Sequence, residues 1–101
     1  MAKYKFTNKA IQDLSDIWSY TAENWSEKQA DKYYRRIIES CTTLAKNPQQ
    51  GKTYFEVYPE LFGQRTSKHL IFYRLIDPTT IEIIRILHER MDLKNQLEDN
   101  V

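Results

Sequence analysis

Two runs rich in Ile, Leu, Phe and Tyr lie late in the chain and flank the polar segment Asp77-Pro78-Thr79-Thr80. Proline presets the backbone angle of the second turn position, and aspartate can bond the backbone just beyond it. The pattern therefore predicts a β-hairpin over residues 67–92 that reverses at Pro78 and Thr79. We expect this hairpin to organise the rest of the fold.

The turn also predicts how the two strands pair. With Asp77 opposite Thr80 and no slip along the strands, His69 lies opposite His88, and side chains alternate between two faces. The first face then holds Arg65, Ser67, His69, Ile71, Tyr73 and Leu75 beside Glu82, Ile84, Ile86, His88 and Arg90. The second face holds Lys68, Leu70, Phe72, Arg74 and Ile76 beside Ile81, Ile83, Arg85, Leu87 and Glu89. Neither face is purely apolar or polar, so we expect both to be partly covered.

The first half of the chain has helical spacing instead. Apolar residues separated by three and four positions predict a helix from Ala10 to about Glu23, capped by Thr7 or Asn8. Its expected apolar stripe consists of Ile11, Leu14, Ile17 and Trp18. The stripe is the side that should face a core.

A second helix follows after a joint at residues 24–26. Ser26 and Gln29 have the spacing of a capping box, and Pro48 ends the helix because proline disfavours the helical conformation in the residue before it. Its apolar positions are Ala30, Tyr33, Tyr34, Ile37, Ile38, Cys41, Leu44 and Ala45. So short a joint requires the two helices to form an antiparallel hairpin.

Shorter segments complete the expected fold. Lys3 to Phe6 is predicted to be a strand, Tyr54 to Tyr58 another short strand, and Arg65 begins the first strand of the main hairpin. Residues 93–97 are expected to form a helical turn, and residues 95–101 a frayed tail. The fold class is α+β: an N-terminal strand and an antiparallel helical hairpin packed on one face of a small, mainly antiparallel β-sheet, as a single domain over residues 1–101.

Composition narrows the classes of function. The 101 residues include 15 basic and 14 acidic side chains, a formal charge of +1, which is too balanced for a general nucleic-acid or membrane binder. One cysteine, Cys41, excludes a disulfide within the chain and a cysteine-based zinc site. We expect a soluble protein of the reducing cytoplasm, since no segment resembles a signal peptide or a membrane span.

His69 and His88 are the first candidate functional residues. Together with Arg65, Tyr73 and Arg90 they suggest an acid/base pair for RNA cleavage, or a polar surface for a target protein. Two histidines without a third converging ligand make a poor zinc site. An equally good reading is that the two imidazoles pack and bond across the strand pair.

The other basic and aromatic residues favour structural roles. The predicted register places Lys68, Arg74 and Arg85 on the face opposite to Arg65 and Arg90, which splits any phosphate-binding patch. For Arg85 we expect pairing with a carboxylate, the candidates being Asp13, Asp16 and Glu89. The aromatic residues expected in the core are Trp18, Tyr33 and Tyr34, whereas Trp25 at the helix joint fits a core or a binding surface.

Motifs spread along the chain resemble those of one protein family. They are Thr7-x-x-Ala10-x-x-Asp13-Leu14-x-x-Ile17-Trp18-x-Tyr20, Ala30-x-x-Tyr33, Leu44-Ala45-x-Asn47-Pro48-x-x-Gly51, His69-x-Ile71-Phe72-Tyr73-Arg74 and Ile84-x-Ile86-Leu87-His88-x-Arg90-Met91-Asp92. In order and spacing they resemble ParE toxins, of the RelE/ParE superfamily of bacterial toxin-antitoxin systems. The resemblance covers Tyr4 to Asp92 and is weakest over residues 53–62.

The resemblance implies a toxin that binds DNA gyrase, traps it with its DNA cleaved, and is neutralised in a hetero-oligomer with a ParD-like antitoxin. It implies roles in plasmid stabilisation or stress response, and neither catalytic residues, metal nor cofactor. The alternatives are a RelE-like ribosome-dependent mRNA endoribonuclease and a degenerate toxin that only binds its antitoxin. The residues expected to contact the target are Arg65, His69, Tyr73, His88 and Arg90. For the antitoxin, the edge at Tyr4 to Phe6 and a groove beside the helical hairpin are two possible routes.

Overall fold

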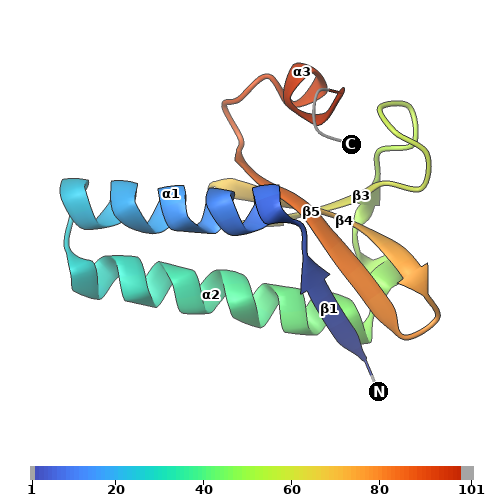
Figure 1. Ribbon diagram of the computed structural model, residues 1–101, viewed down its shortest axis with the longest axis horizontal. Coiled ribbons are helices and arrows are strands. Elements are labelled where there is room, and N and C mark those ends of the chain that lie inside the picture. Colours follow the sequence, from blue (N-terminus) through green and yellow to red (C-terminus); the bar gives the residue numbers. More distant parts are fainter. Residues whose placement is uncertain (1, 99–101) are drawn as a thin grey trace.

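A five-stranded sheet carries a helical hairpin in the computed structural model, which describes residues 2–98 (Figure 1). The strands are β1 (Lys3–Phe6), β2 (Lys52–Thr53), β3 (Phe62–Thr66), β4 (His69–Asp77) and β5 (Thr80–His88). The helices are α1 (Asn8–Asn24), α2 (Glu27–Lys46) and α3 (Leu93–Glu98), with a 3-10 turn, η1, at Pro48–Gln50. The strand order is β1-β5-β4-β3-β2, in which β1 runs parallel to β5 and the other neighbours are antiparallel. The predicted α+β class with a mainly antiparallel sheet is confirmed.

The two long helices begin at the caps that the sequence indicates. Thr7 Oγ1 accepts a hydrogen bond from the Ala10 N–H at 3.1 Å, and Ser26 Oγ accepts one from the Gln29 N–H at 3.0 Å. These side chains satisfy backbone donors that the first turn of a helix leaves without a partner. The predicted antiparallel helical hairpin is confirmed. No helix within residues 2–98 combines the length and the apolarity needed to cross a bilayer.

The β4–β5 hairpin has the predicted pairing at both ends and a slip of one residue between them. His69 lies opposite His88, and Asp77 lies opposite Thr80. Tyr73, however, pairs with Ile83, where an unbroken register would pair it with the next residue along β5. The first shift, between Phe72 and Tyr73, is a β-bulge that leaves one residue of β5 outside the ladder, and a second shift between Leu75 and Asp77 restores the predicted pairing before the turn.

The bulge changes which face the residues 81–84 occupy. Ile81 and Ile83 join Tyr73 in the core beneath the helices, whereas Ile84 packs with Phe72 on the opposite face. The faces predicted for this part of β5 are therefore wrong. Because side chains alternate along a strand, a slip of one residue moves each of them across the sheet.

A turn that the sequence analysis did not predict separates β3 from β4. Thr66 pairs directly with His69, and Ser67 between them has a positive φ of 56°. The strand expected to continue from Arg65 is therefore broken, and Arg65 lies opposite Leu70. Residues paired in this way share a face, so Arg65 is on the other face from His69, contrary to the prediction.

The short strand expected at residues 54–58 is also wrong. Residues 55–58 form turns, and Tyr54 closes the segment by donating its N–H to the Leu61 carbonyl at 2.8 Å. The pairing with β3 is made instead by Lys52 and Thr53 of β2. The segment between β2 and β3 thus folds over the sheet and does not extend it.

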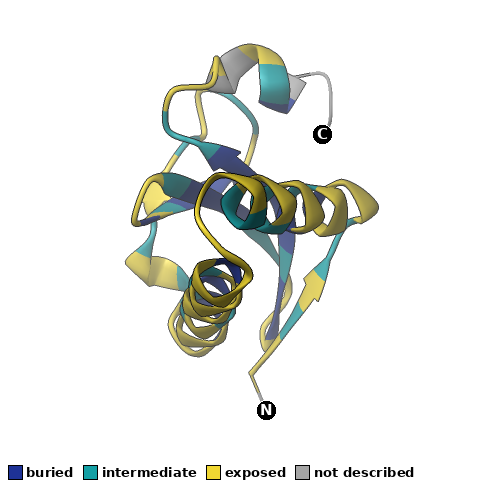
Figure 2. Ribbon diagram, turned by 90° about the vertical axis from the view of Figure 1, so that its left-hand side faces the viewer, coloured by how far each residue is buried: buried dark blue, intermediate teal, exposed yellow. Residues whose placement is uncertain are grey.

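Both faces of the sheet are covered, as predicted, and buried positions follow β4 and β5 (Figure 2). The core beneath the helices consists of Ala10, Leu14, Ile37, Cys41, Leu44, Ala45, Phe62, Ile71, Tyr73, Ile81, Ile83 and Ile86. The core on the opposite face consists of Leu61, Leu70, Phe72, Ile84, Leu87 and Leu97. The second core is closed by α3 and by the segment between β2 and β3, which supplies Tyr54, Val57 and Tyr58.

Three expectations about packing need correction. Ile11 and Tyr34 were predicted to be core residues, but their exposed fractions are 54% and 42%. Both line a groove along the helical hairpin that reaches Phe6 of the edge strand β1. Residues 95–98 belong to α3, where Leu97 is fully buried, so the frayed tail expected from residue 95 does not begin there. Residues 99–101 of that tail lie outside the described residues.

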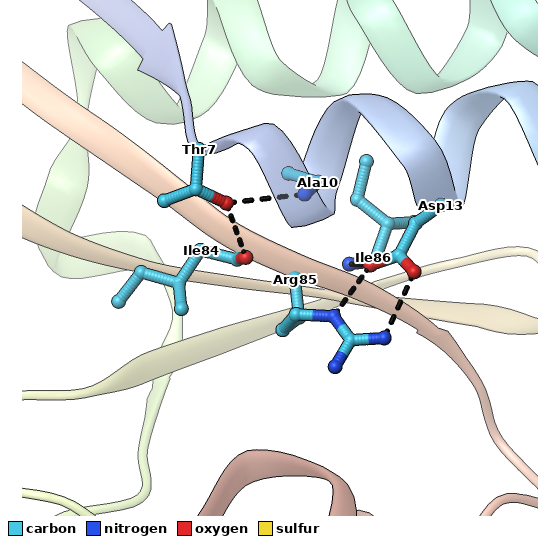
Figure 3. Close-up of polar contacts among 6 residues, drawn as sticks. All are labelled: Thr7, Ala10, Asp13, Ile84, Arg85 and Ile86. Atoms are coloured by element: carbon cyan, nitrogen blue, oxygen red, sulfur yellow. Dashed lines mark hydrogen bonds and ion pairs between the residues drawn. The ribbon is translucent and has the colours of Figure 1, made fainter. Parts of the chain in front are cut away.

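The first turns of α1 close the edge of β5 where β1 ends (Figure 3). Thr7 Oγ1 donates to the Ile84 carbonyl at 2.7 Å, and Asp13 accepts from the Ile86 N–H at 3.0 Å. Asp13 also receives two hydrogen bonds from the Arg85 guanidinium, at 2.7 and 2.9 Å. Of the three carboxylates proposed for Arg85, Asp13 is thus the partner. The pair joins α1 to the last strand and raises the pKa of Arg85, chiefly through the hydrogen bonds.

Candidate partner-binding cleft

A cleft of about 810 Å³ lies between the helical hairpin and the polar end of the sheet. Helix α1 and the joint after it contribute Asp16, Ile17, Tyr20, Thr21 and Trp25, and α2 contributes Gln29, Tyr33 and Arg36. The turn between β3 and β4 and the end of β5 contribute Ser67, Lys68, His69, His88, Arg90 and Met91. The lining therefore carries three arginine or lysine cations and one carboxylate.

The two histidines meet in this cleft, as their predicted pairing requires. Their rings are edge to face, with centroids 5.2 Å apart. His69 Nδ1 lies 2.6 Å from the Tyr33 hydroxyl oxygen, and His88 Nδ1 accepts from the Arg90 N–H at 3.1 Å. The second contact assigns the proton of neutral His88 to Nε2. Among the described residues, no group of three or more His, Cys, Asp or Glu side chains is placed to hold a metal ion.

Burial fixes the charge state of His69. It lowers the pKa of His69 to about 4, and repulsion from the neighbouring His88 adds to the effect. Burial likewise raises the pKa of the Tyr33 hydroxyl bonded to it. At neutral pH, His69 and Tyr33 therefore form a neutral hydrogen-bonded pair that joins β4 to the N-terminal half of α2.

The arginines within the described strands are each paired with a carboxylate. Arg65 forms an ion pair with Glu89, and Arg74 pairs with Glu82 at 3.1 Å. Arg85 on β5 pairs with Asp13 at 2.7 Å. A clamp for a phosphate group needs cations whose hydrogen bonds are available to it. The strands therefore supply structural ion pairs in place of such a clamp.

Two of the five residues predicted to contact a target lie outside the cleft. Tyr73 is fully buried, and its hydroxyl donates to the Pro48 carbonyl at 2.7 Å and accepts from the Gly51 N–H at 3.1 Å. It has no exposed surface for a partner to touch. Arg65 is exposed but lies on the other face of the sheet, beside Glu89. The structure brings together the remaining three, His69, His88 and Arg90.

A comparison with protein families identifies the group to which this arrangement belongs. Residues 4–93 match the family described as "ParE toxin of type II toxin-antitoxin system, parDE". The chain belongs to the ParE toxin family. It is accordingly a toxin of a type II toxin-antitoxin system, within the RelE/ParE superfamily.

Named ParE toxins from several bacteria are similar to this ParE-family chain over almost its whole length. Toxin ParE1 of Mycobacterium tuberculosis is 31% identical over 96 residues, covering 95% of this chain and 98% of the relative. Toxin ParE1 of Caulobacter vibrioides is 30% identical, with 96% and 99% covered. Toxin ParE of Escherichia coli is 32% identical over 103 residues, with 100% and 98% covered.

Two solved structures have the same fold as this ParE-family chain. The chromosomal ParDE toxin-antitoxin system from P. aeruginosa superposes with a TM-score of 0.74 at 23% identity, covering 87% of this chain and 96% of that chain. The RelBE2 toxin-antitoxin complex from Mycobacterium tuberculosis superposes with a TM-score of 0.66 at 22% identity, covering 86% and 96%. At these identities the similarity shows the fold alone.

Of the residues that line the cleft of this ParE-family toxin, only His69, His88 and Arg90 were predicted from the sequence as contact residues. Tyr20, Trp25 and Arg36 come from the helical hairpin, and Lys68 comes from the unpredicted turn. One signal is present in the sequence: the position of Trp25 at the helix joint fits a core or a binding surface, and its exposed fraction of 77% assigns it to the surface. The other residues could be assigned to the cleft only from the structure, which places the end of the helical hairpin beside the turn between β3 and β4.

The stability of the toxin is expected to fall as the pH falls from about 6.5 to 4. His69 binds a proton more weakly in the folded chain, where its pKa is about 4, than in the unfolded chain. The contribution of neutral His69 to the free energy of unfolding is therefore complete above the pKa of the unfolded state. It is lost as the pH falls from there toward the pKa of the folded state, because the unfolded chain gains a proton first. After allowance for solvent screening, we expect a loss of about 1–2 kcal/mol, measured by urea unfolding at pH 7 and pH 4.5.

The variant His69→Gln supplies the control for this pH dependence. Glutamine keeps a hydrogen-bonding group near Tyr33 but does not titrate, so the pH-dependent loss should become smaller by the same amount. An equal loss in the variant and in the unchanged chain would contradict the assignment to His69.

Proposed function

We propose that this ParE-family toxin inhibits DNA gyrase by binding it and trapping the complex in which the DNA is cleaved. The observation that favours binding over catalysis is that most ionisable side chains of the sheet already form ion pairs or hydrogen bonds that stabilise the fold. Each strand arginine is paired with a carboxylate, and His69 is neutral and bonded to Tyr33. The contact surface in this proposal is the cleft, with His88 and Arg90 as its sheet-side residues.

The proposal includes neutralisation by a ParD-like antitoxin in a hetero-oligomer. The family description names parDE, and one similar structure is a ParDE toxin-antitoxin system. The open edge of β1 and the adjoining groove lined by Phe6, Ile11, Trp18 and Tyr34 offer such an antitoxin an extended and an apolar route. The compartment we propose is the cytoplasm, where the buried thiol of Cys41 remains reduced.

The test is supercoiling by purified gyrase in the presence of the toxin, with DNA cleavage complexes trapped by detergent and counted. We expect inhibition and accumulation of cleaved DNA. The variant Arg90→Ala should weaken inhibition about three- to tenfold, because it removes an exposed cation of the cleft. Lys46→Ala, an exposed cation at the far end of α2, is the matched control and should leave inhibition unchanged. Undisturbed supercoiling with excess folded toxin would refute the proposal.

One observation favours a second candidate, a RelE-like ribosome-dependent endoribonuclease. His88 lies in the same cleft as Arg36, Lys68 and Arg90, so an ionisable ring is accompanied by three cations. Primer extension on translated mRNA would reveal cuts at defined positions that disappear in His88→Ala. Expression without antitoxin tests the third reading, a degenerate toxin, which requires that the folded chain leaves growth unaffected.

A further inference from the structure

The cleft has two chemically different sides. On the sheet side, Lys68 and Arg90 supply cations and His88 supplies a hydrogen-bond donor, and Arg36 adds a third cation from α2. Because His88 Nδ1 accepts from the Arg90 backbone, the ring has only its Nε2–H to offer to a ligand. On the hairpin side, Ile17 lines the cleft together with the strongly exposed Trp25.

We propose that this cleft binds a protein segment that presents a carboxylate beside an apolar side chain. The inference rests on the proposed function in one respect, that the cleft receives a protein partner. A carboxylate only accepts hydrogen bonds, so it matches the donors of His88 and Arg90, and its charge matches the surrounding cations. The neighbouring apolar side chain packs against Trp25 and Met91, whose exposed fractions are 77% and 47%.

Charge distinguishes this partner from a nucleic acid. A phosphate backbone is held by many cations along its length, whereas the whole chain has a formal charge of +1. The strand arginines already have carboxylate partners, and Asp16 adds a negative charge to the lining of the cleft. The three cations that remain, Arg36, Lys68 and Arg90, line one cleft and do not form an extended track, which suits one or two carboxylates.

The experiment uses a short peptide of repeating Leu-Glu-Glu as the probe, with the full chain labelled for backbone amide NMR. A peptide of repeating Leu-Gln-Gln has the same shape without the charge, and a single-stranded DNA oligonucleotide tests the phosphate backbone. The Leu-Glu-Glu peptide should shift the amide signals of Ser67, His88 and Arg90 and bind about tenfold more tightly than the Leu-Gln-Gln peptide. Raising the salt concentration should weaken binding of the Leu-Glu-Glu peptide, because salt screens the attraction between charges.

Surface variants test whether the cleft cations are responsible. Lys68→Gln and Arg90→Gln are each expected to weaken binding of the Leu-Glu-Glu peptide about three- to tenfold, without loss of folding, since both side chains are exposed. Lys46→Gln removes the same charge from the far end of α2 and should change the affinity by less than about twofold.

Several results would overturn the inference. The first is equal affinity for the two peptides, and the second is tighter binding of the oligonucleotide at the same amides. The third is that raising the concentration of the toxin alone, without peptide, shifts the same amide signals in the same way, because the shifts would then report self-association. The outcomes also separate this inference from the function it rests on. If gyrase is inhibited but the peptides are not discriminated, the carboxylate assignment fails alone. If the peptides are discriminated but gyrase is unaffected, only the target is wrong.

Discussion

Replacing Asp13 by alanine is expected to lower the free energy of unfolding by about 3–5 kcal/mol. The side chains of Asp13 and Arg85 are each only 11% exposed, so the variant leaves a nearly buried guanidinium without its carboxylate. It also removes the acceptor of the Ile86 N–H on the edge of β5. Since small domains are stable by only about 5–15 kcal/mol, urea unfolding should show a large shift of the midpoint.

Three further variants define the cause of this loss. Asp13→Asn keeps an oxygen for the Ile86 N–H and should be less destabilising than alanine. Glu82→Gln breaks the more exposed pair with Arg74 and should cost less than about 1 kcal/mol. Replacing both partners by apolar residues, as in Asp13→Leu with Arg85→Met, should recover much of the stability. A loss in Asp13→Ala no greater than in Glu82→Gln would contradict the structural role of the pair.

The second large effect is expected for Gly51→Ala. Its backbone has an ordinary extended conformation, with φ −71° and ψ 160°, so the requirement for glycine comes from space and not from backbone freedom. A Cβ there would overlap the Tyr73 hydroxyl and lie 3.0 Å from Cζ of the same ring. That ring is fully buried and its hydroxyl is held by the Pro48 carbonyl, so it cannot retreat. We expect a loss of about 2–4 kcal/mol, measured by urea unfolding.

A double-mutant cycle with Tyr73→Phe isolates this contact. The single Tyr73→Phe change leaves the Pro48 carbonyl and the Gly51 N–H without their partner and should cost about 1–3 kcal/mol. Because it also removes the overlapping oxygen, the double variant should be more stable than the sum of the two losses predicts, by about 1–2 kcal/mol. Lys52→Ala, at an exposed neighbouring position, is the control. Strict additivity would show that the overlap is not the cause.

Local signals in the sequence were sufficient to predict the helices and the main hairpin, but not the irregularities within the sheet. The caps at Thr7 and Ser26 and the turn after Asp77 depend on neighbouring residues, and each is found where it was expected. The bulge near Ile84 and the turn at Ser67 depend on how the two faces of the sheet are filled, which no single strand encodes.

The same division explains the outcome for the candidate site. His69 and His88 were brought together correctly because the hairpin turn fixes their pairing. The prediction for Arg65 is wrong because no local signal indicates the turn at Ser67, and the prediction that Tyr73 contacts a target is wrong because its hydroxyl is bonded inside the fold. Trp25 and Lys68 could not be assigned to the cleft from periodicity, since each lies at the junction of two elements.

The parallel pairing of the first and last strands has a consequence for synthesis of the chain. Thr7 and its partner Ile84 are 77 positions apart, so β1 leaves the ribosome long before the strand that completes its pairing. At about 5–20 residues per second, Ile84 is added to the chain roughly 4–15 s after Thr7. During that time the nascent chain holds an unpaired strand and the exposed apolar side of its helices. This interval is also the time in which a partner already present in the cell can meet the unfinished toxin.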